Sequence, residues 1–287
     1  MLPFATLSFP DGPPFGPSAA QSTRTFNPFS EAALRTLCTV LTLGALCLCA
    51  AAQTTGQTSS PQAAARTDVY HVMFTKTALG KAAQAENALK AGLPGAPMPD
   101  HRLVLRHQEG DEWDYMVIEH MGTKATVEAT GTPIPPATRD LFAWHGDTLA
   151  AGPSWAEFTR AMGIAPDAVG KTGGSVYVVQ VANAAPGQRD ALEKAVSTPP
   201  APGNGGPAVP SEIVVLQHLE GGPWNFITVT RYNSWQDFGT DEAARTSAMA
   251  KTPGQGGWYQ LRDVAPFHRD TLTDRVFPPV TVQAATK

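Results

Sequence analysis

The stretch that decides the fold is HQEGDEW at residues 107–113, which returns with the same key residues as HLEGGPW at 218–224. Each copy follows a short aliphatic run, at 103–105 or 214–216, and precedes an aromatic position, Tyr115 or Phe226. Apolar runs on both sides of a Glu-Gly pair predict a β-hairpin with a tight turn. The sequence therefore predicts two matching hairpins.

The match extends outward from the hairpins in both directions. Upstream, VYHVMF (69–74) and VYVVQV (176–181) predict strands, and each is followed by a glycine, Gly80 or Gly187, and a helix over 81–91 or 188–196. Downstream, Ser234 is a candidate N-cap for a helix that begins at Trp235. WHGDTL (144–149) and FHRDTL (267–272) then predict a last helix in each copy. The sequence thus predicts a duplicated β-α-β-β-α unit.

The predicted division of the chain follows from this repeat. Repeat one covers residues 68–165 and repeat two covers 175–277, with a linker at 166–174 and a tail at 278–287. In the hairpin of repeat one, Leu103 and Leu105 fall on one face of the strand and Val104 on the other. Both faces of the predicted sheet are therefore apolar, and we expect a second layer to cover each.

The unit order, the glycine that opens the first helix and the exit YNSW (232–235) resemble the dimeric α+β-barrel superfamily. The resemblance covers about residues 68–277 and implies an α+β fold in which two ferredoxin-like units pack sheet to sheet as a fused barrel around a cavity. A fourth strand for each unit is missing from the pattern. The superfamily includes cofactor-free monooxygenases, haem-dependent enzymes and barrels without known activity, and no motif of this sequence selects among them.

The N-terminal region predicts export. Arg35 precedes an apolar segment, 37–48, and Ala50–Ala52 follow it, which is the pattern of a secretory signal peptide. Residues 1–33 are rich in Pro, Gly, Ser and Phe and predict an extension, with the true start near Leu34. Residues 53–67 predict a flexible tether. All three cysteines, Cys38, Cys47 and Cys49, lie in the signal, so cleavage near Ala52 leaves a cysteine-free chain in the periplasm or outside the cell.

Composition and motifs exclude several classes of function. The net charge is −4 and Lys and Arg do not cluster, so we expect no nucleic-acid partner. The glycine-rich stretches do not lead from a strand into a helix with a Lys-Ser/Thr, so they are not phosphate loops. The sequence shows neither a dinucleotide fingerprint nor a serine or cysteine nucleophile, and we assign no metal.

The hairpin motif supplies the first candidate ligand-binding residues. His107 with Glu109, and His218 with Glu220, lie two apart on a strand, a spacing that can bind a metal or share a proton. Alternatively, Glu-Gly opens the turn and the histidine caps the strand edge. The aromatic residues at matched positions are candidates for core packing or for lining a cavity: Trp113, Trp224, Tyr70, Tyr177, Tyr115 and Phe226.

The second motif supplies the candidate catalytic residues. His145 with Asp147, and His268 with Asp270, could act as a base, a ligand or the axial ligand of a haem. Alternatively, Asp and Thr form local hydrogen bonds in a helix turn. Neither the cofactor nor enzymatic activity follows from these residues alone.

We therefore expect an exported protein that binds a small molecule in the cavity between two duplicated halves. A cofactor-free or haem-dependent oxidoreductase is the alternative, and a structural or partner-binding role without a ligand is the third possibility. The oligomeric state stays open.

Overall fold

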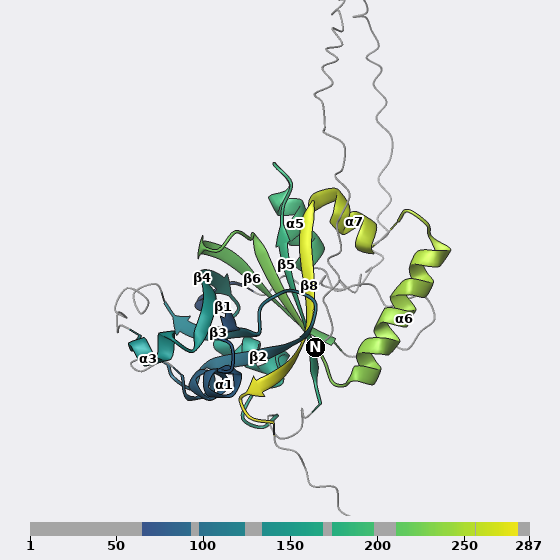
Figure 1. Cartoon of the computed structure of the whole chain (residues 1–287). Coiled ribbons are helices and arrows are strands. Elements are labelled where there is room, and N and C mark those ends of the chain that lie inside the picture. Colours follow the sequence, from purple (N-terminus) through teal and green to yellow (C-terminus); the bar gives the residue numbers. More distant parts are fainter. Residues whose placement is uncertain are drawn as a thin grey trace, which may run out of the picture. The chain divides into compact units, whose positions relative to one another are not determined.

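Eight antiparallel strands close on themselves in the order β1-β3-β2-β8-β5-β7-β6-β4 (Figure 1). The computed structural model describes residues 65–92, 98–123, 134–168, 174–197, 211–255 and 257–280, all within one unit, Gln57–Lys287. The strands are β1 Asp68–Thr77, β2 Arg102–Glu109, β3 Tyr115–Gly122, β4 Phe142–Gly152, β5 Val176–Asn183, β6 Ser211–Gly221, β7 Phe226–Tyr232 and β8 Phe267–Phe277. The helices are α1 Ala82–Ala91, α3 Pro136–Arg139, α4 Trp155–Ala161, α5 Arg189–Ser197, α6 Trp235–Lys251 and α7 Gly257–Val264.

The prediction of a last helix in each repeat is wrong, because residues 144–149 and 267–272 lie in strands β4 and β8. The prediction for repeat two relied on Leu261, Val264, His268, Leu272 and Val276. Leu261 and Val264 lie in helix α7, whereas the last three residues, spaced four apart, lie in β8. Four is close to one helical turn but is also a multiple of two, so the same spacing fits one face of a strand. Thr271 and Thr273 face the other side of β8 and are buried, which is the alternation of a strand.

The predicted fold class, two β-α-β-β-α units packed sheet to sheet, is also wrong. Each repeat contributes a fourth strand, β4 or β8, and the sheets join edge to edge instead of face to face. β2 of repeat one pairs with β8 of repeat two, and β6 of repeat two pairs with β4 of repeat one. The result is a single closed barrel. Closure removes the open strand edges that separate sheets would expose.

The interior of the barrel is a packed core. Side chains alternate along each strand, so every second residue points inward. The inward-facing residues of the one large core cluster include Tyr70, Val72, Phe74, Leu103, Leu105, Met116, Ile118, Ala150, Tyr177, Val179, Val214, Leu216, Ile227 and Val229. Two smaller clusters lie outside the barrel, one around Leu89 of α1 and the other around Leu192 of α5.

The duplicated sequence motifs meet at the two places where the repeats join. We call the β2–β8 junction the first seam and the β4–β6 junction the second seam. Gly110 lies against the backbone of Asp270 at the first seam, and Gly221 lies against that of Asp147 at the second. Both glycines have positive φ, +124° and +103°, and a Cβ at either position would overlap the carbonyl oxygen of the aspartate.

The threonines of the motifs also bridge the seams. The backbone N–H of Asp111 donates to Thr271 Oγ1 at 3.3 Å, and that of Gly222 donates to Thr148 Oγ1 at 3.0 Å. The two motifs therefore recur because each repeat's hairpin turn rests on the Asp-Thr of the other repeat. The alternative prediction, a helix turn stabilised by Asp and Thr, is wrong because these residues lie in strands β4 and β8.

Helix α4 follows repeat one and packs against the barrel core through Phe158. Ser154 and Glu157 form a capping box at its N-terminus. The carbonyls at its C-terminal end accept hydrogen bonds from repeat two: Ala161 from Arg231 Nε at 2.8 Å and Met162 from Tyr177 Oη at 3.0 Å. These donors supply partners for carbonyls that lack one within the helix.

Several predictions fall on residues outside the described ranges. The signal peptide with Cys38, Cys47 and Cys49, the N-terminal extension and most of the tether are among them. The last tether residues are described, and there Arg66 pairs with Glu193 of α5. None of the helices in the described part of the chain has the length and apolar character of a membrane span.

Candidate functional site

The predicted aromatic candidates lie in the protein core. Tyr70, Tyr177 and Phe226 are fully buried, and Tyr115 is nearly so. The hydroxyl of Tyr70 donates to the carbonyl of Pro153 at 2.7 Å, and burial raises its pKa. These contacts are those of packed structural side chains.

His107 and His218 occupy matched positions beneath the hairpins. Their rings lie 5.8 Å from Trp113 and 5.7 Å from Trp224, measured between ring centroids. Glu109 and Glu220 are exposed, and in the part of the chain that the structure describes neither shares a hydrogen bond with its histidine. The Nε2 atoms of both histidines are buried without a hydrogen-bond partner among the described residues. The structure thus brings each histidine to its tryptophan and not to its glutamate.

His145 and Asp147 join a chain of alternating acids and imidazoles on the outer face of repeat one. His71 Nδ1 lies 3.0 Å from Glu119 Oε2, and His71 Nε2 lies 2.9 Å from Asp147 Oδ1. Asp147 Oδ2 lies 3.2 Å from His145 Nε2. Strands β3, β1 and β4 are neighbours: Glu119 pairs directly with His71, and Asp147 and His145 lie two and four residues before Leu149, the β4 partner of His71, on the same face. We call Glu119, His71, Asp147 and His145 the outer chain.

His71 is the charged centre of the outer chain. Burial alone would lower its pKa, but hydrogen bonds to Asp147 and Glu119 outweigh burial and raise the pKa to about 9. Asp147 is also desolvated, yet the contact with His71 holds its pKa below the usual value. His71 is therefore an imidazolium between two carboxylates at neutral pH.

Repeat two lacks this arrangement. The positions of His71 and Glu119 are taken by Val178 and Thr230, as the matching strand registers show. Asp270 accepts a hydrogen bond from Gln180 Nε2 at 2.7 Å, and His268 Nε2 lies 3.5 Å from Asp270 Oδ2. The two predicted His-Asp pairs therefore sit in different surroundings.

A second histidine cluster lies where β1 begins. His120 Nε2 is 2.7 Å from Asp68 Oδ2, and His120 Nδ1 is 3.1 Å from His101 Nδ1. Because Asp68 as a carboxylate only accepts, His120 donates from Nε2, and in a neutral His120 the Nδ1 atom then accepts the proton of His101. Trp155 stacks on both rings, with centroids at 4.7 and 5.2 Å. Burial and the neighbouring His120 lower the pKa of His101.

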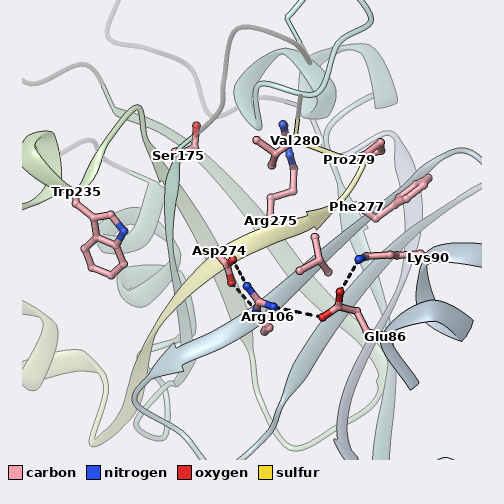
Figure 2. Close-up of a pocket in the computed structure, with 12 residues that line it drawn as sticks. Glu86, Lys90, Arg106, Ser175, Trp235, Asp274, Arg275, Phe277, Pro279 and Val280 are labelled. Atoms are coloured by element: carbon pink, nitrogen blue, oxygen red, sulfur yellow. Dashed lines mark hydrogen bonds and ion pairs between the residues drawn. The ribbon is translucent and has the colours of Figure 1, made fainter. Parts of the chain in front are cut away.

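A pocket of about 750 Å³ lies outside the barrel, along the first seam (Figure 2). This volume is within the range of small-molecule sites. Figure 2 shows Trp235 on one side, Phe277 on the other and the Arg106–Asp274 pair between them. The lining residues are Glu86, Lys90, Arg106, Gly174, Ser175, Trp235, Asp274, Arg275, Val276, Phe277, Pro279 and Val280.

The charged groups of the pocket are tied together. Arg106 donates to Asp274 from Nε at 3.2 Å and from Nη2 at 2.7 Å, and from Nη1 to Glu86 at 3.4 Å. Lys90 and the hydroxyl of Tyr115 also donate to Glu86. The contact with Lys90 lowers the pKa of Glu86, and Asp274 raises the pKa of Arg106. These contacts therefore favour the charged forms of Glu86 and Arg106.

The pocket is not suited to haem or a bound metal. Its lining has no His, Cys, Met or Tyr, the residues that supply axial ligands to haem iron. In the described ranges of the chain, no group of three or more His, Cys, Asp and Glu could hold a metal ion.

Most residues of these sites are not among the residues that the sequence predicted. His71, Glu119, Asp68, His101 and His120 are not shared by the two repeats, and the sequence prediction rested on shared residues. A histidine in the aliphatic run VYHVMF, where repeat two has valine, was the available signal. Arg106 and Asp274 are 168 positions apart and become neighbours only through the pairing of β2 with β8.

Comparisons with known proteins give structural similarities only. No protein-family model matches the sequence, and no curated protein matches it. A provisionally named monooxygenase from Lactobacillus acidophilus NCFM is 10% identical, with a TM-score of 0.42 over 73% of this chain and 94% of its own. An anthrone oxidase-like protein is 14% identical, with a TM-score of 0.43 over 77% and 98%.

A variant of chlorite dismutase from Candidatus Nitrospira defluvii is 11% identical, with a TM-score of 0.37 over 73% of this chain and 92% of its own. All three proteins belong to the dimeric α+β-barrel superfamily. Because the TM-scores are below 0.5, these similarities carry no argument about activity.

Proposed function

We propose that the protein binds a small organic molecule in the first-seam pocket, between Trp235 and Phe277. The observation that carries the proposal is the pocket itself: about 750 Å³, with Trp235 and Phe277 on its walls and five charged side chains in its lining. The volume and the aromatic walls are those of small-molecule sites, in which polar groups fix the orientation of the ligand. The proposed site lies outside the barrel and not in its interior, where the sequence predicted it, because core side chains fill the interior.

The test uses an uncharged aromatic probe, N-phenyl-1-naphthylamine, whose fluorescence rises in apolar surroundings. Trp235→Leu removes one wall of the pocket, and we expect it to weaken probe binding at least about fivefold. Trp258→Leu is the matched control, because Trp258 is 53% exposed, close to the 51% of Trp235, and does not line the pocket. Equal binding by the two variants would refute the proposal.

A cofactor-free oxidoreductase of the monooxygenase type is the second candidate. The outer chain favours it, because an imidazole held between carboxylates can move a proton during catalysis. No histidine lines the pocket, so a ligand there would not touch that chain. Oxygen uptake with a panel of hydroquinones tests this candidate, and loss of the uptake in His71→Val but not in Trp235→Leu would favour it over binding.

We also propose that the protein acts outside the cytoplasm, after cleavage near Ala52. The support is the pattern of Arg35, the apolar segment 37–48 and Ala50–Ala52. N-terminal sequencing of the protein from its host tests the cleavage. A mature N-terminus upstream of Arg35 would contradict it.

A further inference from the structure

The polar groups that line the first-seam pocket offer more unused hydrogen-bond donors than unused acceptors. Lys90 has three N–H bonds and donates one of them, to Glu86. Arg106 has five N–H bonds, and three hydrogen bonds join it to Asp274 and Glu86. Both cations therefore keep N–H bonds that no carboxylate in this network uses.

The two carboxylates are close to saturated. A carboxylate has about four lone-pair positions. Glu86 accepts from Lys90, from Arg106 and from Tyr115 Oη at 2.9 Å. Asp274 accepts twice from Arg106 and once from Gln108 Nε2 at 2.8 Å. Donors are thus in excess where a ligand would meet these groups.

The exposure of the side chains agrees with this count. In each ion pair the cation is the more exposed partner: Lys90 is 38% exposed against 19% for Glu86, and Arg106 is 44% exposed against 34% for Asp274. The N–H groups of Lys90 and Arg106 are therefore more accessible to a ligand than the carboxylate oxygens of their partners. Trp235 and Phe277 lie on either side of those groups (Figure 2), and the guanidinium of Arg102 lies over the Phe277 ring at 4.2 Å from its centroid.

We propose that the pocket selects aromatic anions, with the ring system between Trp235 and Phe277 and the anionic group accepting hydrogen bonds from Lys90 and Arg106. A carboxylate, sulfonate or phenolate has the acceptor geometry that these donors require. The proposal rests on the proposed function, since it names the class of molecule that the same pocket takes.

The experiment compares two probes that share one ring system. 1-Anilinonaphthalene-8-sulfonate carries a sulfonate, and N-phenyl-1-naphthylamine is the same skeleton without it. We expect the full-length chain to bind the anion more tightly and the preference to shrink with added salt. Lys90→Gln should weaken binding of the anion about tenfold, the loss of one charge-assisted hydrogen bond, and should leave the uncharged probe unchanged.

Lys81→Gln is the matched control, because Lys81 immediately precedes α1, is exposed and lies outside the pocket. Equal affinity for the two probes, or an equal effect of Lys90→Gln on both, would overturn the anion selection. If Trp235→Leu still weakens both probes in that case, the pocket itself stands. Loss of the Trp235 effect would instead refute the proposed function.

Discussion

The two seams close the same barrel but differ on their outer surfaces. At the first seam Arg106 faces Asp274 across the strands, and at the second the equivalent pair is Gln217 and Ala151. Among the described residues, no ion pair joins the two strands of the second seam. There Arg66, from the segment before β1, pairs with Glu193 and donates to Gln217 Oε1 at 2.9 Å.

The surroundings of Arg66 repeat those of Arg106. Leu89 and Val196 are equivalent in the repeats, so Glu86 corresponds to Glu193, and Tyr115 corresponds to Phe226. Arg106 contacts Glu86, whereas Arg66 contacts Glu193 and lies over the ring of Phe226 at 5.7 Å. At the second seam, the segment before β1 therefore covers the place that corresponds to part of the pocket at the first seam.

This difference separates two kinds of residue. Those shared by the repeats, such as Gly110 and Gly221, join the strands of the barrel. Those found at one seam or in one repeat, such as Arg106 or His71, form the pocket and the outer chain. Residues that the two repeats share therefore belong to the scaffold, and residues that differ between the repeats form the candidate sites.

The largest effect is expected from the seam glycines. Gly110→Ala and Gly221→Ala each place a Cβ against a carbonyl oxygen at positive φ, and each should lower the free energy of unfolding by about 3 kcal/mol. Urea unfolding measures both. Gly174→Ala, also at positive φ but with open space around it, should cost about 1 kcal/mol. A large effect at only one seam would contradict the equivalence of the seams.

The outer chain gives the next effect. His71→Val introduces the residue type that repeat two has at this position, and should cost about 2 kcal/mol at pH 6. The folded pKa of about 9 lies above the unfolded value of about 6.5, so the stabilisation is fully present below pH 6.5 and is lost as the pH rises through 9. Stability curves from pH 6 to 10 measure this, and a constant difference across that range would refute the charged His71.

Arg66 tests the cover of the second seam. Arg66→Ala removes a partly buried pair with Glu193 and should lower the free energy of unfolding by about 1 to 1.5 kcal/mol. Arg160→Ala is the control: its pair with Glu212 is more exposed, and its loss should cost less than about 0.5 kcal/mol. If the two variants are equally stable, Arg66 does not hold the segment against the seam.

The smallest expected effect comes from a matched pair of tyrosines. Tyr70→Phe and Tyr177→Phe each remove one buried hydroxyl that donates to a backbone carbonyl, of Pro153 or of Met162. Each should cost about 1 kcal/mol by thermal or urea unfolding. A difference of more than about 1 kcal/mol between them would show that the two repeats hold α4 and its flanking residues unequally.

The sequence correctly predicted those elements whose apolar residues recur with one clear spacing, that of a helix or that of a strand. The hairpins, the first strands and the helices α1 and α5 are confirmed close to the predicted bounds. β4 and β8 were missed because an i, i+4 spacing fits both a helix and a strand face. The pocket was missed because its pairs, such as Arg106 with Asp274, depend on which strands become neighbours, and no local pattern encodes that.

The strand β8 lies between β5 and β2 although it is the last strand in the described part of the chain (Figure 1). During synthesis, β2 leaves the ribosome long before its partner Phe267–Phe277 exists. Every nascent chain that ends before β8 is complete therefore exposes unpaired strand edges, which can pair with another chain. We expect final closure to wait for translation to pass Phe277, so premature stops just before that residue should give aggregation and not a smaller folded protein.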